Sequence, residues 1–407
     1  MHSKLKQLLL ISLIFLSASS YADQVIKGFV VYQDRTSATN VAVYINYSTT
    51  HTRTNKDGYF ELNVNEGYHD LIVSSIGYET IIYKMKVAEY NSALTFILVK
   101  KQVLNFSKTE SEDVWKHHLK IFNEAFIGKT AMAQGCTITN PKTLSFTFNP
   151  SKGELTAISK APLLIENKSL GYLISYDLKE FTSSIISLSY DGYVHYKKLK
   201  GNPPQEKRWI ENRELAYKGS RTHFIRSLIN KNLEEQGFFV HQFNRFPNPN
   251  SPKKSEIQKA RETVVKNYNY QEFDSIIKPT KKAIDSARSV LRKLSLPKYS
   301  EVVYNKKPSY NEMLLHKNND YYIKFDGYLK IIYTREREEK RYLQSHFVKS
   351  IREAGYQITN LDLLSSSILI DSSGAITQPL NLLMEGYWAF KRIADLLPLN
   401  YPENINE

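Results

Sequence analysis

The stretch Thr52-Arg53-Thr54-Asn55-Lys56-Asp57-Gly58-Tyr59-Phe60 joins a tight turn to the start of a β-strand. The turn needs a residue with positive φ, which Gly58 adopts without a Cβ penalty. Short runs rich in β-branched and aromatic residues surround it, at spacings of roughly 8–12 residues. These runs are 25–33, 42–47, 59–64, 69–76, 80–87 and 94–99. With no helix-period segment between them, they predict a small all-β sandwich or barrel over residues 23–102.

Three further stretches accompany this turn: Ile26-Lys27-Gly28-Phe29-Val30-Val31, Asn40-Val41-Ala42-Val43-Tyr44-Ile45 and Val73-Ser74-Ser75-Ile76-Gly77-Tyr78. Together they resemble the carboxypeptidase regulatory-like domain, a transthyretin-like β-sandwich. The resemblance implies a non-catalytic domain of a kind that accompanies peptidases and also occurs at the N-terminus of outer-membrane TonB-dependent receptors. The carboxypeptidase name therefore implies no activity for this chain.

The first 22 residues have the features of a secretory signal peptide. Lys4 and Lys6 precede an apolar run over 8–16, and Ser20 and Ala22 occupy the −3 and −1 positions of a cleavage site. The apolar run is about half the ~20 residues that a membrane-spanning helix needs. No cysteine follows it, so the pattern predicts an exported chain that starts near Asp23 without a lipid anchor.

Residues 103–407 mix helical and strand patterns and predict an α+β region with antiparallel strands. A capping box at Thr109 introduces a helix that ends at Gly128. Strands are expected at 144–148, 154–159, 171–181, 184–196, 238–243, 321–334, 356–361 and 366–371. Further helices are expected at 206–217, 220–236, 336–354 and 383–397.

This second region also resembles known proteins. The stretches that carry the resemblance include 161–172, 213–220 and Gly386-Tyr387-Trp388. The chain is similar to uncharacterised exported proteins of Gram-negative bacteria that pair a carboxypeptidase regulatory-like domain with such a region. The resemblance implies a protein of the periplasm or outer membrane, or a secreted one, and it brings no catalytic residues with it.

The motifs of common active sites are missing from the sequence. None of the ten histidines has Glu three residues later, so the zinc ligands of a carboxypeptidase are absent. The neighbours His117 and His118 point about 100° apart on a helix, which disfavours a shared metal. The single cysteine, Cys136, lies in a short β-like stretch, and we expect it to be buried. We therefore predict no catalytic residue, no metal ligand and no cofactor.

Carboxylates and tryptophans supply the remaining candidates for a site. One group of carboxylates falls in the first strand-rich block and a second near the C-terminus; they are Glu166, Asp177, Glu180 and Asp191, and then Asp362, Asp371 and Asp395. Two carboxylates at a suitable separation would allow glycoside hydrolysis. The three tryptophans, Trp115, Trp209 and Trp388, lie on predicted helices, and we expect them to be core anchors.

Charge is concentrated in one segment. The whole chain has a net charge of +14, and residues 251–300 hold 12 Lys and Arg against 5 Asp and Glu. This predicted helical segment is either a solvated face or a contact with anionic lipid, while export argues against nucleic acid.

The sequence predicts a non-catalytic cell-envelope protein that interacts with another envelope protein or a glycan. Two alternatives stay open. One is a hydrolase of envelope glycan or peptide with its site in residues 103–407. The other is an accessory component of an outer-membrane uptake or secretion system.

Overall fold

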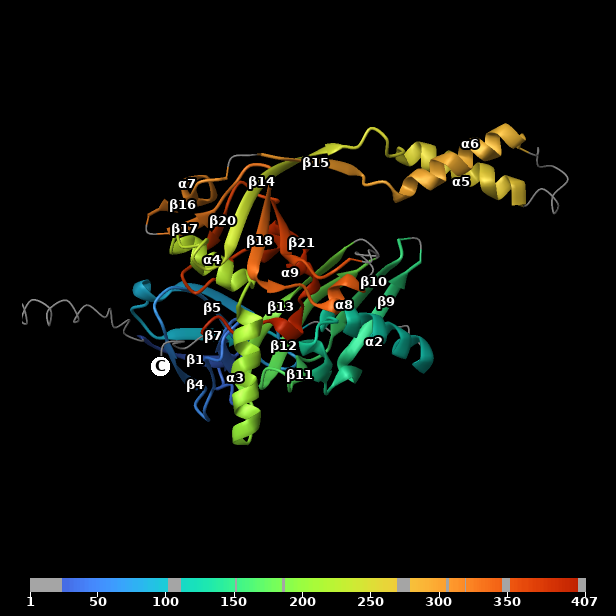
Figure 1. Ribbon diagram of the computed structural model, residues 1–407. Helices are drawn as coiled ribbons and strands as arrows, with labels where there is room; N and C mark the ends of the chain where they lie inside the picture. Colours follow the sequence, from blue (N-terminus) through green and yellow to red (C-terminus); the bar gives the residue numbers. More distant parts are fainter. Residues whose placement is uncertain are drawn as a thin grey trace, which may run out of the picture.

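A computed structural model describes residues 24–101, 111–150, 152–184, 187–268, 279–304, 307–318, 320–345 and 352–401. The predicted signal peptide and the predicted capping residue Thr109 lie outside this part of the chain. Figure 1 shows a body built from an N-terminal lobe, a middle lobe and a C-terminal lobe, from which a long arm projects.

The N-terminal lobe is the all-β sandwich that the sequence predicts. Its strands form the sheets β4-β1-β7 and β3-β2-β5-β6, and apolar side chains such as Val30, Phe60 and Leu71 are buried between them. Gly58 adopts φ +73° at the expected turn. The strands are β1 Gln24–Tyr32, β2 Ala42–Ile45, β3 His51–Arg53, β4 Tyr59–Val64, β5 Tyr68–Ser74, β6 Ile81–Lys86 and β7 Leu94–Leu98.

The middle lobe packs helix α2 (Glu112–Phe126) against an antiparallel sheet of order β8-β11-β12-β10-β9, with β13 pairing β12. Phe122 and Phe126 of α2 are fully buried against Phe181 and Tyr176 of β12. Helix α3 (Pro203–Tyr217) follows this sheet. The strands are β8 Cys136–Ile138, β9 Leu144–Asn149, β10 Glu154–Ser159, β11 Leu163–Asn167, β12 Tyr172–Ser183 and β13 Leu188–Lys198.

The C-terminal lobe has its own core, in which helix α4 (Arg221–Ile229) and Trp388 cover a sheet of order β15-β14-β18-β19-β21. A second sheet has the order β16-β17-β20. The strands are β14 Phe238–Pro247, β15 Tyr299–Val303, β16 Leu314–Lys317, β17 Asp320–Ile323, β18 Tyr328–Arg337, β19 Tyr356–Leu363, β20 Ile368–Ile370 and β21 Leu382–Gly386. The short helices are α7 Tyr310–Met313, α8 Lys340–Leu343 and α9 Tyr387–Phe390.

The arm leaves the C-terminal lobe through the ends of β14 and β15. Helices α5 (Lys254–Tyr268) and α6 (Lys281–Arg292) form its tip. Figure 1 shows this helical pair held well away from the three lobes. Both helices fall within the predicted basic segment, which ends at Ser300 inside β15.

Two predicted helices are wrong. The segment 336–354 begins as the end of β18 and has only the single turn of α8 before residues 346–351, which are not described. The segment 383–397 begins as β21, and Gly386 at φ +84° then redirects the chain into α9. In the second segment, pairing of β21 with β19 overrides a helix-like apolar spacing.

The C-terminal segment ties the lobes together. Ala394 is fully buried in the middle lobe, where its N–H donates to the Ile127 carbonyl at 3.2 Å and its carbonyl accepts from Asn167 Nδ2 at 3.0 Å. Further along, Asn400 Nδ2 donates to Thr49 Oγ1 of the sandwich at 2.6 Å. After completing the C-terminal lobe, the chain thus runs across the interface between the sandwich and the middle lobe.

The sandwich is also docked directly. The loop after β2 pairs with β13: the Tyr47 N–H donates to the Val194 carbonyl at 2.8 Å, and the Tyr196 N–H donates to the Ser48 carbonyl at 2.9 Å. Asn46 Oδ1 accepts from the Val194 N–H at 2.9 Å. One end of the sandwich is therefore occupied by its own chain.

Candidate binding surface

The base of the arm is a two-stranded ribbon whose outer strand, β15, is exposed on both faces. Strand β18 pairs with β14 only over Phe238–Phe243, and β15 pairs with it over Phe243–Pro247. Every residue of β15 is exposed. Phe246, Tyr299 and Val302 leave 51%, 52% and 48% of their surface accessible. Isolated exposed apolar side chains are ordinary, but a ribbon of them is typical of an interaction surface.

Strand β15 also has an open edge, because it lies at the end of its sheet and pairs only with β14 among the described strands. The Tyr304 N–H donates to the Gln242 carbonyl at 2.9 Å, and the Asn248 N–H donates to the Lys298 carbonyl at 2.9 Å. In an antiparallel ladder such pairs alternate with residues that face away. The backbone groups of Tyr299, Glu301 and Val303 therefore point to the open edge.

An ionic cluster lies where the ribbon joins the sheet, and we call it the clamp: Arg245, Glu301, Lys330 and Glu385. Arg245 donates to Glu385 Oε1 at 3.0 Å and to Glu301 Oε1 at 3.1 Å. Lys330 Nζ donates to Glu301 Oε2 at 2.9 Å. The clamp thereby connects both strands of the ribbon to β18 and β21.

Aromatic rings form the floor of the clamp. The Phe243 and Tyr328 rings stack with their centroids 5.2 Å apart, and the Arg245 guanidinium carbon lies 4.8 Å from the Tyr328 centroid. Cations over such rings gain electrostatic attraction from the ring face.

The clamp shifts the pKa values of its members. The hydrogen bond to Glu385 raises the pKa of Arg245 further above its already high value. Burial alone would raise the pKa of Glu301, but the hydrogen bonds from Lys330 and Arg245 outweigh it, and the pKa is lowered. Nearby on β19, burial raises the pKa of Asp362. Glu301 and Glu385 both serve as partners of Arg245, so the arrangement suits a structural clamp better than an acid–base pair.

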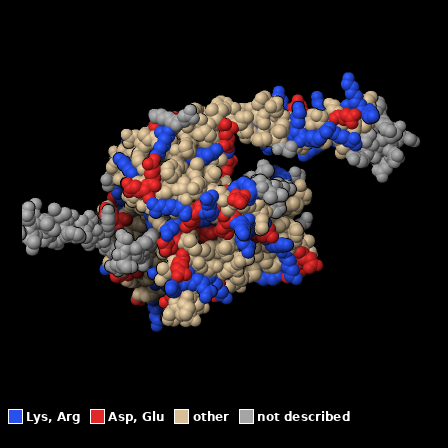
Figure 2. Space-filling view, in the orientation of Figure 1, with Lys and Arg blue, Asp and Glu red and all other residues tan. Residues whose placement is uncertain are grey.

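The tip of the arm is a basic helical pair. Ala260 and Ala287 are 4% and 6% exposed and form the small contact between α5 and α6. Figure 2 shows Lys and Arg spread along the visible side of the arm, with few acidic residues among them. The exposed bases are Lys253, Lys254, Lys259, Arg261, Lys281, Lys282, Arg288, Arg292, Lys293 and Lys298.

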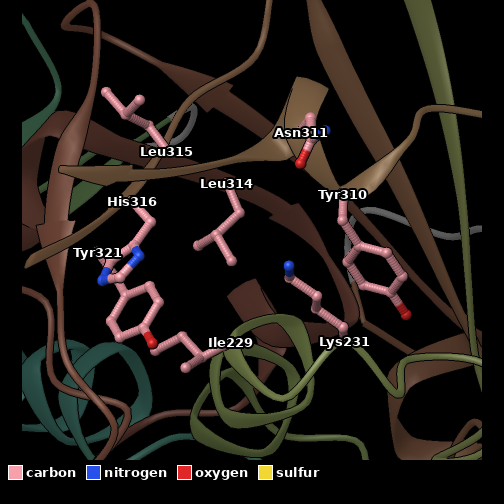
Figure 3. A pocket seen from close by; sticks show the side chains of 8 residues that line it. All are labelled: Ile229, Lys231, Tyr310, Asn311, Leu314, Leu315, His316 and Tyr321. Carbon is pink, nitrogen blue, oxygen red and sulfur yellow. The ribbon is translucent and has the colours of Figure 1, made fainter. Parts of the chain in front are cut away.

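Two adjoining pockets lie elsewhere on the C-terminal lobe. The first encloses about 320 Å³ and is shown in Figure 3, where Lys231, Asn311 and the stacked rings of His316 and Tyr321 surround Leu314. The second encloses about 290 Å³ and shares Tyr310 with it. The described residues that line these two pockets include no Asp or Glu, so neither pocket contains a pair of carboxylates.

The structure buries Cys136 in part, as its sequence context predicts. Its Sγ lies 3.6 Å from the Met132 carbonyl oxygen, and burial raises the pKa of the thiol to about 12. The thiol is therefore protonated at neutral pH and is a poor nucleophile. His118 is buried on α2 against Phe146, whereas His117 is exposed. In the described part of the chain, no group of three metal-ligating side chains is arranged to hold an ion.

Three candidate carboxylates of the middle lobe, Asp177, Glu180 and Asp191, come together on the paired strands β12 and β13, whereas Glu166 lies on β11. Asp177 accepts from Thr80 Oγ1 of the sandwich at 2.5 Å, and Asp191 pairs with Lys179 at 3.2 Å. Glu166 pairs with its near neighbour Lys168 at 3.2 Å. Glu180 is exposed and lies opposite Asp191 in the β12–β13 ladder. Asp177, Asp191 and Glu166 thus hold structure together.

The candidate carboxylates near the C-terminus lie in three different places. Asp371 closes a turn by accepting from the Ser373 and Ala375 N–H groups. Asp395 is buried and accepts from Thr130 Oγ1 at 2.8 Å, and burial raises its pKa to about 6. Only Asp362 lies on the sheet that carries the clamp.

The tryptophans are anchors. Trp209 and Trp388 are buried and donate to the carbonyls of Lys168 and Gly219, at 2.8 and 2.7 Å. Trp115 packs against the middle-lobe core, and its indole donates to the Leu144 carbonyl at 3.2 Å.

Sequence reasoning missed the clamp entirely. Arg245, Glu301, Lys330 and Glu385 are far apart in the chain and belong to no motif. A weak signal was present in the alternation of β14, where Phe243 and Arg245 fall on one face. Their partners become evident only once the strand order is known.

Comparison with known proteins identifies the first lobe. Residues 26–109 match the CarboxypepD_reg-like domain, so the chain carries this domain at its N-terminus. No curated protein matches the chain. None of the described helices is both long and apolar enough to cross a membrane.

Two solved structures show limited similarity. A DUF3823 family protein from Bacteroides ovatus is 10% identical, with a TM-score of 0.16, over 44% of this chain and 82% of that one. A protein of unknown function from Bacteroides fragilis, described as membrane-associated in its provisional name, is 10% identical with a TM-score of 0.17. That match covers 90% of this chain and 94% of the other. At these TM-scores we base no conclusion on either structure.

Proposed function

We propose that this is an exported, non-catalytic protein of the cell envelope that binds an extended segment of another envelope protein along the open edge of β15. The signal-peptide pattern of residues 1–22 supports export. The CarboxypepD_reg-like domain at residues 26–109 supports a non-catalytic role for the first lobe. The binding surface is assigned to the arm, because one end of the sandwich is already occupied by its own chain.

The observation that carries this proposal is the edge of β15. Exposed edge strands are usually protected by charge, proline or a covering element, because their free N–H and C=O groups pair readily with other chains. The segment Tyr299-Ser300-Glu301-Val302-Val303 has one charged residue, and Arg245 and Lys330 neutralise it. An incoming strand would find outward-facing backbone groups and apolar side chains beside them.

The charge of the arm indicates which segment fits. The ribbon runs directly into the basic pair α5 and α6. A partner strand laid along β15 continues toward those bases, so an acidic flank would be attracted to them. The partner is therefore a peptide segment that is extended and apolar at the ribbon, and acidic beyond it.

Site-specific photocrosslinking in the producing cells tests this proposal. A benzoylphenylalanine at Tyr299 should crosslink to one envelope protein, through a peptide with an apolar core and an acidic flank. The same probe at Ile210, an exposed residue of α3, should not capture that protein.

Edge variants supply the second part of the test. Val303→Pro removes an outward N–H without removing a ladder bond, and Val303→Lys adds a charge that disfavours edge pairing. Each variant should lower the crosslinking yield from the probe at Tyr299 by about tenfold, because one hydrogen bond and its packing are lost. Val303→Thr preserves the edge and should retain the yield. Equal capture at Tyr299 and Ile210, or full capture by both edge variants while they remain folded, would contradict the proposal.

A further inference from the structure

The tip of the arm differs from the ribbon in its chemistry. The ribbon presents apolar side chains and backbone groups, whereas the tip presents ammonium and guanidinium groups on a helical scaffold. Helix α5 has 15 residues and α6 has 12, so the tip is roughly 20 Å long at 1.5 Å per residue. Figures 1 and 2 show it as the most distant described part of the molecule on that side.

The apolar residues of α6 face its partner helix and leave the bases outside. Ile284, Ala287, Val290 and Leu291 recur at helical spacing and are buried or half-buried. Lys282 lies opposite this apolar stripe, Lys281 and Arg288 flank it, and all three are exposed. The pair α5 and α6 therefore packs most of its apolar side chains between the helices, Val265 being exposed, and directs its charge to solvent.

The acidic residues of the tip are outnumbered by its bases, because Glu256, Glu262 and Asp285 stand among ten exposed Lys and Arg. Glu256 Oε2 accepts from the Lys253 N–H at 2.7 Å, at the start of the helix. Glu262 Oε1 accepts from Gln258 Nε2 at 3.1 Å. Neither carboxylate has an ion pair with a base among the described contacts of the tip.

We infer that the basic tip binds an anionic phospholipid surface, through its Lys and Arg side chains and the lipid phosphates. A membrane surface is a broad array of negative charge, and clusters of several bases on a helical element bind such surfaces by electrostatic attraction. The projection of the tip lets it reach a flat surface before the lobes do. Because most of its apolar residues are buried or half-buried, the contact depends on charge and does not require insertion.

Vesicle sedimentation tests this inference on the full-length chain. Vesicles of phosphatidylcholine with about one-third phosphatidylglycerol should bind the protein, and vesicles of phosphatidylcholine alone should not. The triple variant Lys281→Glu, Lys282→Glu, Arg288→Glu should lower the partition coefficient by about 100-fold, since each base near the surface contributes about fivefold. Two of the new acids lie in the first turn of α6, where negative charge stabilises a helix, so the variant should fold.

A matched control separates a local contact from overall charge. Lys200→Glu, Lys207→Glu, Arg208→Glu makes the same change in charge at exposed positions on and before α3. At physiological salt, charges more than about 8 Å from the contact are largely screened. The control should therefore bind anionic vesicles within about threefold of the parent protein.

Three results would overturn the inference. They are equal binding to neutral vesicles, equal loss of binding in the control, and no binding of the folded parent protein to anionic vesicles. The Val303→Pro variant should bind vesicles normally, because its change lies in the ribbon. A failure of the lipid contact is thus distinguishable from a failure of the proposed strand pairing.

Discussion

The sandwich and the ribbon at the base of the arm are both built from β-strands, and they are used in opposite ways. In the sandwich, the loop after β2 pairs with β13, and Asn400 and Leu399 from the C-terminal segment bond to the same loop. In the arm, β15 leaves its outer edge open and all its residues exposed. The segment that sequence patterns make recognisable is held within the molecule, and the segment without a motif is presented to solvent.

This contrast shows that a recognisable domain need not be the one that binds. The end of the sandwich that carries the loop after β2 contacts the middle lobe through Tyr47, Ser48 and Asn46. Burial there joins the lobes into one body. Because the arm projects from the lobes, it gains little stability from contacts with them. A bound partner would supply further contacts.

The largest expected effect on stability contrasts the core of the sandwich with the surface of the arm. Phe60 is 1% exposed in the sandwich and packs against Phe96, with ring centroids 6.1 Å apart. Phe60→Ala should lower the free energy of unfolding by about 3–5 kcal/mol, because it leaves a cavity. Val265→Ala, at a position 54% exposed on α5, should change it by less than about 0.5 kcal/mol. Urea unfolding measures both, and similar losses would show that the arm is as integral to the fold as the sandwich.

A smaller effect is expected where the sandwich docks. Asn46 is buried, and its Oδ1 accepts from the N–H groups of Val194 and Tyr47 at 2.9 and 3.1 Å. Asn46→Ala should cost about 1–3 kcal/mol, since it leaves a buried donor without its partner. In calorimetry we expect the sandwich to begin unfolding ahead of the other lobes. Lys56→Ala, at an exposed turn, is the control, and an equal effect there would contradict docking through Asn46.

The smallest effect on stability is expected at the clamp. Loss of the clamp should instead change the direction in which the arm projects. Arg245→Ala should cost about 1 kcal/mol or less, because the ion pairs are partly exposed. Arg245→Ala should also broaden the distribution of distances between spin labels attached at Val265→Cys and Ile210→Cys. These labels are measured in a Cys136→Ser background. Arg245→Lys should give a distribution of intermediate width, between those of the parent protein and Arg245→Ala. An ammonium lacks the forked guanidinium geometry that reaches both carboxylates.

The clamp should also respond to pH, with a definite sign. The folded-state pKa of Glu301 is below its ordinary value, so its contribution is present at neutral pH and is lost as the pH falls through the folded pKa. The distance distribution of the parent protein should therefore broaden as the pH falls through the folded pKa, below the ordinary pKa of a glutamate. In Arg245→Ala, lowering the pH should broaden the distribution little further. An acid titration that leaves the distribution of the folded parent protein unchanged would rule out an ionic clamp.

Much of the fold follows from local patterns. Strands such as β4, β11 and β12 alternate buried and more exposed residues, and turns such as Gly58 and Gly153 need positive φ that glycine supplies. The helix over 383–397 was predicted wrongly, because Leu382–Gly386 pairs with β19. A spacing of apolar residues cannot reveal a strand partner twenty residues away.

The candidate surface was much less predictable. The excess of Lys and Arg in residues 251–300 is visible in the sequence and marks the tip of the arm. The ribbon and the clamp are not visible, because Arg245, Glu301 and Glu385 meet only through the order β15-β14-β18-β19-β21. The carboxylates that the sequence singled out, such as Asp177 and Asp371, instead hold an interface and a turn.

By itself, the sequence determined the β-sandwich, the basic segment and the absence of a zinc carboxypeptidase motif. These depend on residue type and short spacing, which act through local conformation and charge. Only the tertiary structure decided that the sandwich is docked, that the clamp forms and that the arm projects. Those features depend on which strands pair and which faces are covered, and such contacts join residues that are far apart in the chain.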